Sequence, residues 1–431
     1  MRAGMSSIAV AAIIVIIIVA AVGGYIAYNA YSHRLSAAPK YILVGTVYDN
    51  SGSQAVDSLA QYEGLELWAS WVNSHGGIYV KQYGRNLTVK VIALNAASNP
   101  STAESDYETL VNTYHVDVLV ADFGSVMTAP AVSFTNASHV LLWDVTASAV
   151  GLFTNNNYII DTSIPVSEVW MNNVTDFLKY EGVRNVSVIW DDNDFNAFQS
   201  YYLGYFLRQY DIPVVYNTSV ATDTTQYLSL ISAMESERPF AVIELGYPTN
   251  DEAFLPQLVA SKACFPLVFT NYPGLMLPTL LSDIGSDMNG TFTAVFPPII
   301  NYTPQVASKL GLQWFGPTLP QFEQMFEQEF HTSGVNYNNI AGFNAGLIIQ
   351  LAIQDAGTLN QAALKQAVLS DVSGKVMTLA GVFNVTSNGM QVGEAPPIGQ
   401  VFVWPNGTTT VNIVYPPAFA NSTAVIPEPC P

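Results

Sequence analysis

Basic residues and cysteines are scarce in this sequence of 431 residues. Lys and Arg number 14 against 33 Asp and Glu, so the formal net charge is −19. Nucleic acids and anionic membrane surfaces attract a basic face, and the composition therefore argues against both as partners. Two cysteines, Cys264 and Cys430, are too few for a disulfide scaffold or a metal site. The five histidines lie far apart, so we expect no metal.

Catalytic and cofactor motifs are also missing. The sequence has no GxGxxG after a strand, no GxxxxGK[ST], no GxSxG and no HExxH. The acidic stretch 191–194 lacks the spacing and the final Glu of an EF-hand, and we interpret it as a strand-end loop that caps a helix. We therefore expect a protein that is not an enzyme and that holds no cofactor.

One long hydrophobic run is present, at residues 8–28. It carries no charge and is long enough to cross a bilayer as a helix. After a short linker, residues 29–40, the chain continues as a long α/β pattern rich in glycosylation sequons. This arrangement predicts a leader and membrane anchor in residues 1–28 and a globular part outside the cell membrane.

The first residues of the chain resemble an archaeal pilin-type leader. Arg2-Ala3-Gly4 stands shortly before the apolar run. In leaders of this type a peptidase cuts after a small residue that follows a basic one, and the hydrophobic helix stays on the mature protein. A stem of this kind also allows self-assembly. An uncleaved signal anchor and conventional cleavage near Gly24 remain as alternatives.

Ten Asn-x-Ser/Thr sequons accompany this predicted export. Their density is typical of an exported protein, because the acceptors of such glycans lie on exposed surfaces. The ten are Asn86, Asn136, Asn173, Asn185, Asn217, Asn289, Asn301, Asn384, Asn406 and Asn421.

The two cysteines suit the same environment. In an oxidising exterior, a disulfide between Cys264 and Cys430 would tether the Pro-rich tail, residues 416–431, to the body of the protein. Two independent cysteines are the alternative.

From Tyr41 onward, short apolar strands alternate with amphipathic helices. This alternation is typical of βαβ units and of parallel sheets covered on both faces. It runs through two series of about equal length, which predicts two doubly wound lobes. Helices at 320–331, 338–356 and 360–370, then strands at 376–385 and 401–404, are expected to return and complete them. The predicted division is 41–162 with 293–372 for the first lobe and 163–292 with 373–415 for the second.

Several segments resemble the Leu/Ile/Val-binding type of solute-binding protein that serves ABC transporters. Each of these motifs is short, and their order and spacing together make the resemblance specific. The segments are VGTVYDNSG at 44–52, WVNSHGGI at 71–78, VDVLVADFGS at 116–125, VIWDDNDF at 188–195, AVIELGY at 241–247, VNYNNIAGFNA at 335–345 and FNVTSNG at 383–389.

The resemblance implies a type I periplasmic-binding-protein fold, in which two Rossmann-like lobes close on a solute. Three crossings between the lobes are expected near 161–164, 289–295 and 371–376. The implied function is capture of a small polar solute at the cell surface and its delivery to an ABC permease. A ligand-sensing receptor or a surface-assembly component of the same fold is the alternative.

Candidate ligand-binding residues follow from this placement. In open parallel sheets a ligand binds at the carboxyl ends of the strands. The resemblance implies that Gly124 and Ser125 hold a carboxylate and that Phe195 forms an aromatic lid. The full set is Tyr48, Ser51, Gly124, Ser125, Thr146, Ser148, Phe195, Tyr247, Thr270, Asn271 and Tyr272.

The sequence departs from this family at one place. Amino-acid binders of the family have an acidic residue after the last strand of the second lobe, which pairs with the ligand ammonium. Here that stretch, 269–273, is FTNYP and contains no acid. Asp122 and Asp144 are candidates to replace it. A neutral polar ligand, such as an amide or a short peptide, is the alternative, because an unpaired buried ammonium is costly.

Overall fold

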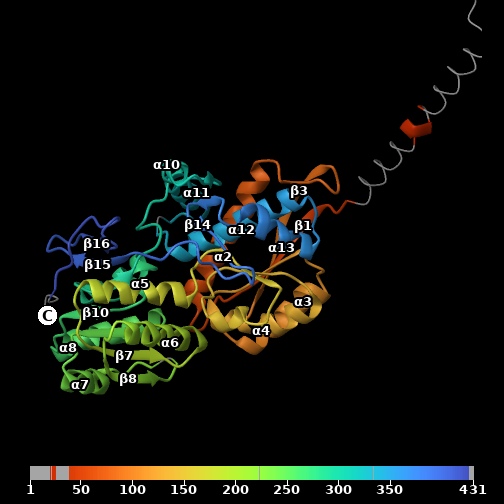
Figure 1. Cartoon of the computed structure of the whole chain (residues 1–431). Helices are drawn as coiled ribbons and strands as arrows, with labels where there is room; N and C mark the ends of the chain where they lie inside the picture. Colours follow the sequence, from red (N-terminus) through yellow and green to blue (C-terminus); the bar gives the residue numbers. More distant parts are fainter. Residues whose placement is uncertain (1–19, 21, 26–37, 223, 333, 427–431) are drawn as a thin grey trace, which may run out of the picture.

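Two separate sheets organise the part of the chain that the computed structural model describes, namely residues 20, 22–25, 38–222, 224–332 and 334–426. Most of the predicted anchor and of the linker, and Cys430 in the tail, lie outside these residues. Among the helices that are described, none has the length and apolar character needed to cross a membrane. Figure 1 shows the two lobes that form around the sheets, lying side by side.

The first lobe contains a six-stranded sheet in the order β2-β3-β1-β4-β5-β6. Its strands run parallel except β2, which pairs antiparallel with β3. The strands are β1 (Tyr41–Tyr48), β2 (Ile78–Val80), β3 (Arg85–Asn95), β4 (Val118–Val120), β5 (Leu142–Asp144) and β6 (Ile159–Asp161). Its helices are α2 (Ala55–Ser74), α3 (Pro100–Asn112), α4 (Gly124–Ser138), η1 (Val150–Phe153), α12 (Tyr337–Ala356), α13 (Gln361–Ala367) and η4 (Val368–Val372).

Two hydrophobic cores cover the two faces of this sheet. Residues of α3 and α4 form one core, and residues of α2 and α12 form the other. Helix α12 is buried at every position from Tyr337 to Ile353. It packs so closely on α2 that a Cβ atom on Gly342 would lie 1.9 Å from the carbonyl oxygen of Gln61. This late segment of the chain is therefore part of the first lobe.

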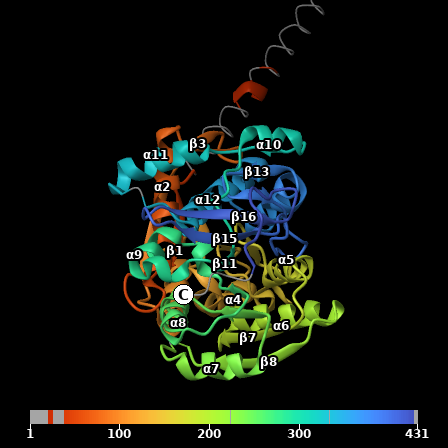
Figure 2. The ribbon, with the colours of Figure 1, turned by 90° about the vertical axis from the view of Figure 1, so that its left-hand side faces the viewer.

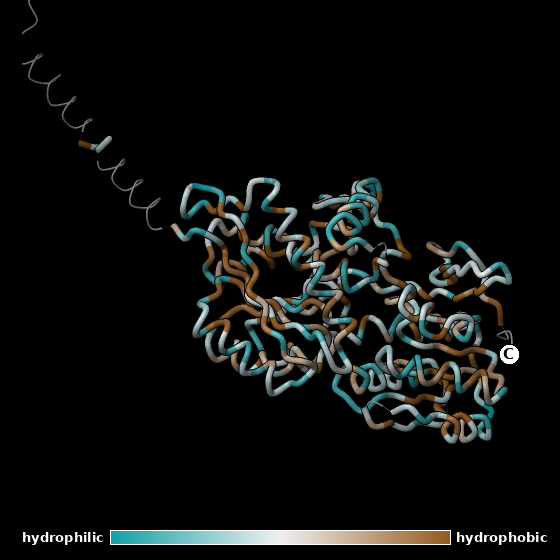
Figure 3. Tube along the Cα trace, turned by 180° about the vertical axis from the view of Figure 1, so that it is seen from behind, coloured by the Kyte–Doolittle hydropathy of each residue, from teal (hydrophilic) through white to brown (hydrophobic). Residues whose placement is uncertain are grey.

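The second lobe contains a seven-stranded sheet in the order β16-β15-β11-β10-β9-β7-β8. Its first five strands in sequence are parallel, and β15 and β16 are antiparallel to their neighbours. The strands are β7 (Val186–Asp191), β8 (Val214–Val220), β9 (Ala241–Leu245), β10 (Leu267–Phe269), β11 (Phe292–Ala294), β15 (Ile398–Val403) and β16 (Thr409–Tyr415). Its helices are α5 (Ser167–Tyr180), α6 (Asp194–Gln209), α7 (Leu228–Glu237), α8 (Pro248–Ser261), η2 (Tyr272–Gly274), α9 (Leu277–Asp283) and η3 (Gly285–Met288). In Figure 3 apolar residues are concentrated along the central strands of both lobes.

A small third sheet departs from the predicted division of the chain. Strands β12 (Gln313–Trp314), β13 (Val376–Thr378) and β14 (Gly381–Phe383) pair with one another and with neither large sheet. They lie near α10 (Pro304–Lys309), at the end of the molecule opposite α7 and β8 (Figure 2), and α11 (Leu319–Phe330) follows β12 in sequence. An apolar run of strand length does not identify its pairing partner, so the sequence alone could not separate this sheet from the second lobe.

The third crossing between the lobes also differs from its predicted place at 371–376. The chain reaches the second sheet only at Ile398, after the small sheet. On the way it runs beside the first crossing, where Asp161 N–H donates to Gly389 O at 2.9 Å and Val166 N–H donates to Gln391 O at 3.1 Å. The second crossing begins after β11, whose three residues belong to the second sheet.

The ten sequons differ in their exposure. Those at Asn86, Asn217, Asn301, Asn406 and Asn421 are exposed, and those at Asn136, Asn185, Asn289 and Asn384 are half-buried. Asn173 departs from the expectation of an exposed acceptor: it is buried, and its Nδ2 donates to Pro396 O at 2.6 Å. Burial and this bond make Asn173 the least accessible of the ten acceptors in the folded chain.

One of the two cysteines, Cys264, lies among the described residues. Cys264 takes part in a disulfide bond. Cys430 lies outside the described residues, so the pairing of the two stays a prediction.

Candidate ligand site between the two lobes

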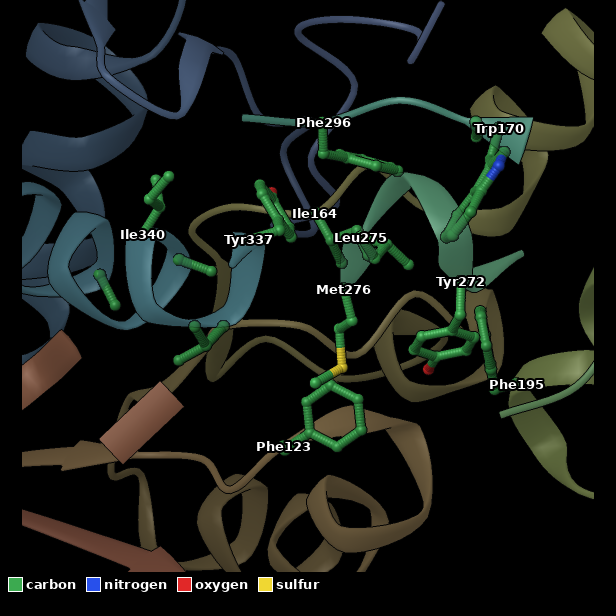
Figure 4. Packing of buried hydrophobic residues seen from close by; sticks show 14 of the residues in the cluster. Phe123, Ile164, Trp170, Phe195, Tyr272, Leu275, Met276, Phe296, Tyr337 and Ile340 are labelled. Carbon is green, nitrogen blue, oxygen red and sulfur yellow. The ribbon is translucent and has the colours of Figure 1, made fainter. Parts of the chain in front are cut away.

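A narrow pocket lies where the strand ends of the two lobes face each other. Its volume is about 10 Å³, room for about one water molecule, so the lobes are nearly in contact here and would have to part to admit a solute. The residues that line it are Phe123, Gly124, Thr146, Ile164, Phe195, Tyr247, Tyr272, Leu275 and Asn338. Figure 4 shows Phe123, Phe195, Tyr272 and Leu275 converging from different elements. This is the position at which open parallel sheets bind ligands.

The polar groups of the first lobe are already bonded within that lobe. Gly124 begins α4 with a φ of +71°, a value that favours glycine, and its N–H donates to Thr146 Oγ1 at 3.1 Å. Thr146 Oγ1 in turn donates to Gln61 Oε1 at 2.7 Å. Ser125 is buried beside them, and its Oγ accepts from Ala149 N–H at 3.1 Å. These bonds fix the shape of the cavity wall.

The second lobe contributes aromatic rings, with Tyr247 at their centre. The Tyr247 ring lies 5.5 Å from Phe195, 6.1 Å from Phe123 and 6.2 Å from Tyr272, between centroids. Only Phe123 belongs to the first lobe, so this cluster spans the gap between the lobes. The Phe123–Tyr247 contact stabilises the approach of the two lobes, because aromatic pairs stabilise beyond their buried area.

The hydroxyl of Tyr247 is the polar group that this arrangement leaves over. Tyr247 is 4% exposed. The backbone N–H of Val126, in the first turn of α4, faces its oxygen, and its hydroxyl proton has no acceptor among the described residues. A Cβ atom on Gly124 would lie 3.1 Å from this oxygen, so the hydroxyl points across the gap at the start of α4. A buried hydroxyl proton without an acceptor costs stability, and a bound ligand could supply the missing acceptor.

Local sequence explains why Tyr247 stands there. It follows β9 and caps α8, where its N–H donates to Asn250 Oδ1 at 2.9 Å. Pro248 occupies the first turn of α8, a position that needs no donor. Asn250 Nδ2 also donates to Tyr227 Oη at 2.9 Å. The cap therefore holds the ring at the strand end.

A buried carboxyl of the first lobe lies directly behind the cavity. Asp57, in the first turn of α2, accepts a hydrogen bond from Asn338 Nδ2 at 2.8 Å. Burial raises the pKa of Asp57 to about 8. The two residues are far apart in sequence, so their contact could only be found in the folded chain.

Three further pairs of buried carboxyls stand behind the strand ends. The pairs are Asp49 with Asp122, Asp144 with Asp161, and Glu244 with Asp251. Burial is the main cause that raises the pKa of all six carboxyls. In Asp122, Asp161 and Glu244 the charge of the paired acid raises the pKa further. Acids that face each other in low dielectric share protons, since both cannot be charged at once.

Asp122 and Asp144, the candidates for an ammonium partner, therefore have a different role. Asp122 Oδ1 accepts from Phe123 N–H at 2.7 Å, and Asp144 Oδ1 accepts from Ala147 N–H at 3.1 Å. Neither is among the described residues that line the cavity. Both carboxyls hold the backbone of the loops that carry the site.

Five of the eleven predicted ligand-binding residues line the cavity: Gly124, Thr146, Phe195, Tyr247 and Tyr272. The other six do not line it, and the structure shows what each contacts or how exposed it is. Tyr48 stacks on Tyr62 at 4.6 Å, and Ser51 is exposed. Ser148 lies 3.2 Å from Ser167 Oγ, Asn271 Nδ2 donates to Gln199 Oε1 at 2.9 Å, and Ser125 and Thr270 are buried in their own lobes.

The sequence reasoning missed four residues of the lining: Phe123, Ile164, Leu275 and Asn338. Phe123 directly precedes Gly124 in the segment VDVLVADFGS at 116–125, so its position in that segment could have identified it. Ile164 lies in the first crossing, and Asn338 lies in the first turn of a helix that follows the second lobe in sequence. Their distance along the chain hides them from any local pattern.

No group of three or more His, Cys, Asp or Glu within the described ranges is placed to hold a metal ion. The pocket thus offers aromatic faces, one hydroxyl proton without an acceptor among the described residues and a nearby carboxyl. These groups could bind a small molecule if the lobes part to admit it.

Fold and site together define a two-lobed α/β protein with a pocket at facing strand ends. Residues 42–397 match the periplasmic binding protein family, and the chain belongs to that family. The match covers both large sheets apart from the last two strands.

Solved structures share this fold at low sequence identity. A leucine-binding protein, LivK, from Thermotoga maritima is 14% identical with a TM-score of 0.72, covering 88% of this chain and 99% of its own. The isoleucine complex of LivJ from Streptococcus pneumoniae is 16% identical with a TM-score of 0.69, covering 86% and 99%. A benzoate complex of a solute-binding protein from R. palustris is 15% identical with a TM-score of 0.69, covering 91% and 97%.

Proposed function

We propose that this protein captures a small polar solute between its two lobes outside the cell and delivers it to an ABC permease. The observation that carries the proposal is the narrow pocket at the facing strand ends, with the hydroxyl proton of Tyr247 left without an acceptor among the described residues at its wall. Closure of two lobes on a ligand couples occupancy to shape, which lets a permease distinguish loaded from empty protein.

The solved neighbours support the size of the solute. Their ligands are leucine-type amino acids and benzoate, all small molecules. In this chain the five predicted residues in the lining, together with Phe123 and Asn338, form the proposed binding set. Amino acids, amides and short peptides are the starting candidates.

The proposed location is the outer side of the cell membrane. The uncharged run at 8–28 would anchor the chain, and the five exposed sequons would face outward. The disulfide at Cys264 fits an oxidising exterior, and we propose Cys430 as its partner. A receptor or surface-assembly component is the second candidate, which the pilin-like residues Arg2-Ala3-Gly4 favour.

A thermal-shift screen tests the proposal. A ligand that binds only the folded state raises the melting temperature. We expect at least one small polar solute to raise the Tm of the full chain in detergent, and Tyr247→Ala to weaken that effect. Tyr201→Ala is the control, because Tyr201 is 61% exposed on α6 of the same lobe. A broad library without any hit, or equal shifts in Tyr247→Ala, would overturn the proposal.

A further inference from the structure

The lining of the cavity contains no positive charge. None of its nine described residues is a Lys, Arg or His. The groups whose charge acts on Tyr247 are carboxylates, those of Asp57, Asp191 and Asp194. Asp57 also acts on Tyr272. A ligand in this cavity therefore meets a negative environment.

A carboxylate ligand would find no adequate partner there. Gly124 N–H already donates to Thr146 Oγ1, which donates onward to Gln61, and the N–H of Val126 faces the oxygen of Tyr247. The Tyr247 hydroxyl could donate a single bond. Burial of an anion without a charged partner, close to another carboxyl, costs several kcal/mol.

A cation would find both a countercharge and suitable faces. Phe123, Phe195, Tyr247 and Tyr272 surround the cavity, and aromatic faces attract ammonium groups. Behind them, Asp57 is bonded to the lining residue Asn338. Because the carboxyl of Asp57 has no basic partner among the described ion pairs and bonds, burial raises its pKa to about 8, and a bound ammonium would favour its charged form.

We propose that the solute carries a protonated amine and no free carboxylate, with Asp57 as its countercharge and the rings of Phe123, Phe195, Tyr247 and Tyr272 as its cage. This inference rests on the proposed function, whose site it shares. It separates this protein from the neighbours, since benzoate is an anion and isoleucine carries a carboxylate. The resemblance places the acid that pairs with an ammonium after β10, where this chain has none. Asp57, from the opposite lobe, would take over that role.

Two matched sets of probes test the inference by isothermal titration with the full chain. One set is phenethylamine, phenylalanine and 3-phenylpropionate, and the other is 3-methylbutylamine, leucine and 4-methylpentanoate. Within each set the apolar body is similar and the charged groups differ. We expect the amine of at least one set to bind at least 10-fold more tightly than the amino acid and the acid.

The variant Asp57→Asn removes the proposed countercharge and keeps the shape of the side chain. It should weaken the amine at least 10-fold and leave the acid unchanged or slightly tighter. Asp211→Asn removes one exposed charge from the second lobe and should change neither. The probe sets keep the inference testable on the natural protein even where Asp57→Asn does not fold.

Three outcomes overturn the inference. An acid or amino acid that binds as tightly as the matched amine, and loses affinity in Tyr247→Ala, refutes it and leaves the proposed function standing. Equal amine affinity in Asp57→Asn and the natural protein refutes the role of Asp57. If no amine binds, the inference is wrong, and the broader thermal-shift screen decides the proposed function separately.

Discussion

The two lobes present opposite kinds of surface to the cavity they share. In the first lobe the strand-end hydroxyls of Ser125 and Thr146 bond to groups of the same lobe. In the second lobe the strand ends carry Tyr247 and Tyr272. The N–H of Val126 faces the Tyr247 oxygen, but the Tyr247 hydroxyl proton has no acceptor among the described residues. The comparison teaches that a strand-end hydroxyl serves the fold when its bonds close locally. The groups left for a ligand are then aromatic rings and a carboxyl behind them.

The lobes also differ in how far their buried acids are shifted. Burial raises the pKa of Asp144 in the first lobe to about 8, whereas that of Asp251 in the second lobe rises to about 6. Asp144 faces Asp161 of the next strand and Thr128 of α4. Asp251 faces Glu244 and also accepts from Tyr272 N–H at 3.0 Å, a bond that favours its charged form.

The largest expected effect is therefore a loss of stability as pH rises. A raised carboxyl pKa means that the folded chain binds more protons than the unfolded chain. The stability that such a carboxyl contributes is fully present below its unfolded pKa, about 4, and is lost progressively as pH rises to its folded pKa. Each such group contributes about 1 kcal/mol per pH unit in its window. In a plot of unfolding free energy against pH, Asp144→Asn should remove this group's share of the downward slope up to about pH 8. Asp251→Asn should remove its share only up to about pH 6.

Urea unfolding from pH 4 to pH 8 measures this difference. The repulsion from the net charge of −19 is common to both variants, so their difference removes it. Asparagine keeps the oxygen that accepts from Ala147 N–H, which preserves the loop in Asp144→Asn. Identical pH curves for the two variants would break the contrast between the lobes.

A second pair of variants compares one helix glycine from each lobe. On Gly342 of α12 a Cβ atom would lie 1.9 Å from Gln61 O, so α2 would have to move. Gly342→Ala should cost about 3 kcal/mol of unfolding free energy. On Gly204 of α6 the nearest atom is the flexible end of Arg208 at 3.6 Å, and Gly204→Ala should stabilise by about 0.5–1 kcal/mol. Chemical denaturation of both measures the contrast. A neutral Gly342→Ala would mean that the two helix backbones are not in contact.

The smallest expected effects come from two buried serines. Ser125→Ala leaves Ala149 N–H without its acceptor and should cost about 1–3 kcal/mol. Ser187 lies on β7 of the second lobe, is 0% exposed, and its hydroxyl has no described partner. Ser187→Ala should stay within about 0.5 kcal/mol of the natural protein. Neither change should alter the affinity for a solute. Weaker binding by Ser125→Ala with normal stability would return Ser125 to the ligand site.

Much of the fold could be predicted because its signal is local. Strands such as β1 and β9 are short apolar runs, and α2 ends at His75-Gly76-Gly77 as its sequence predicts. Family membership follows from residues 42–397, and the two α/β lobes agree with the predicted class. Strand β16 was missed, since its polar and apolar residues form no buried run.

The candidate site was harder to predict because its members are not neighbours in sequence. Gly124, Phe195 and Tyr247 stand directly after predicted strands, and that placement was enough to find them. Ser51 and Asn271 have the same kind of placement, yet one is exposed and the other is bonded to Gln199. Only the folded partners distinguish these cases.

By itself the sequence determined most of the order of strands and helices, the two-lobed class and the acidic character of the chain. Those properties depend on composition and on periodicity within a few residues. The tertiary structure decided which groups at the strand ends remain available. It brought Asp57 to Asn338, turned the hydroxyl of Tyr247 toward Gly124 and enclosed the carboxyl pairs. Burial and hydrogen bonding between distant segments set these outcomes, and no local pattern encodes them.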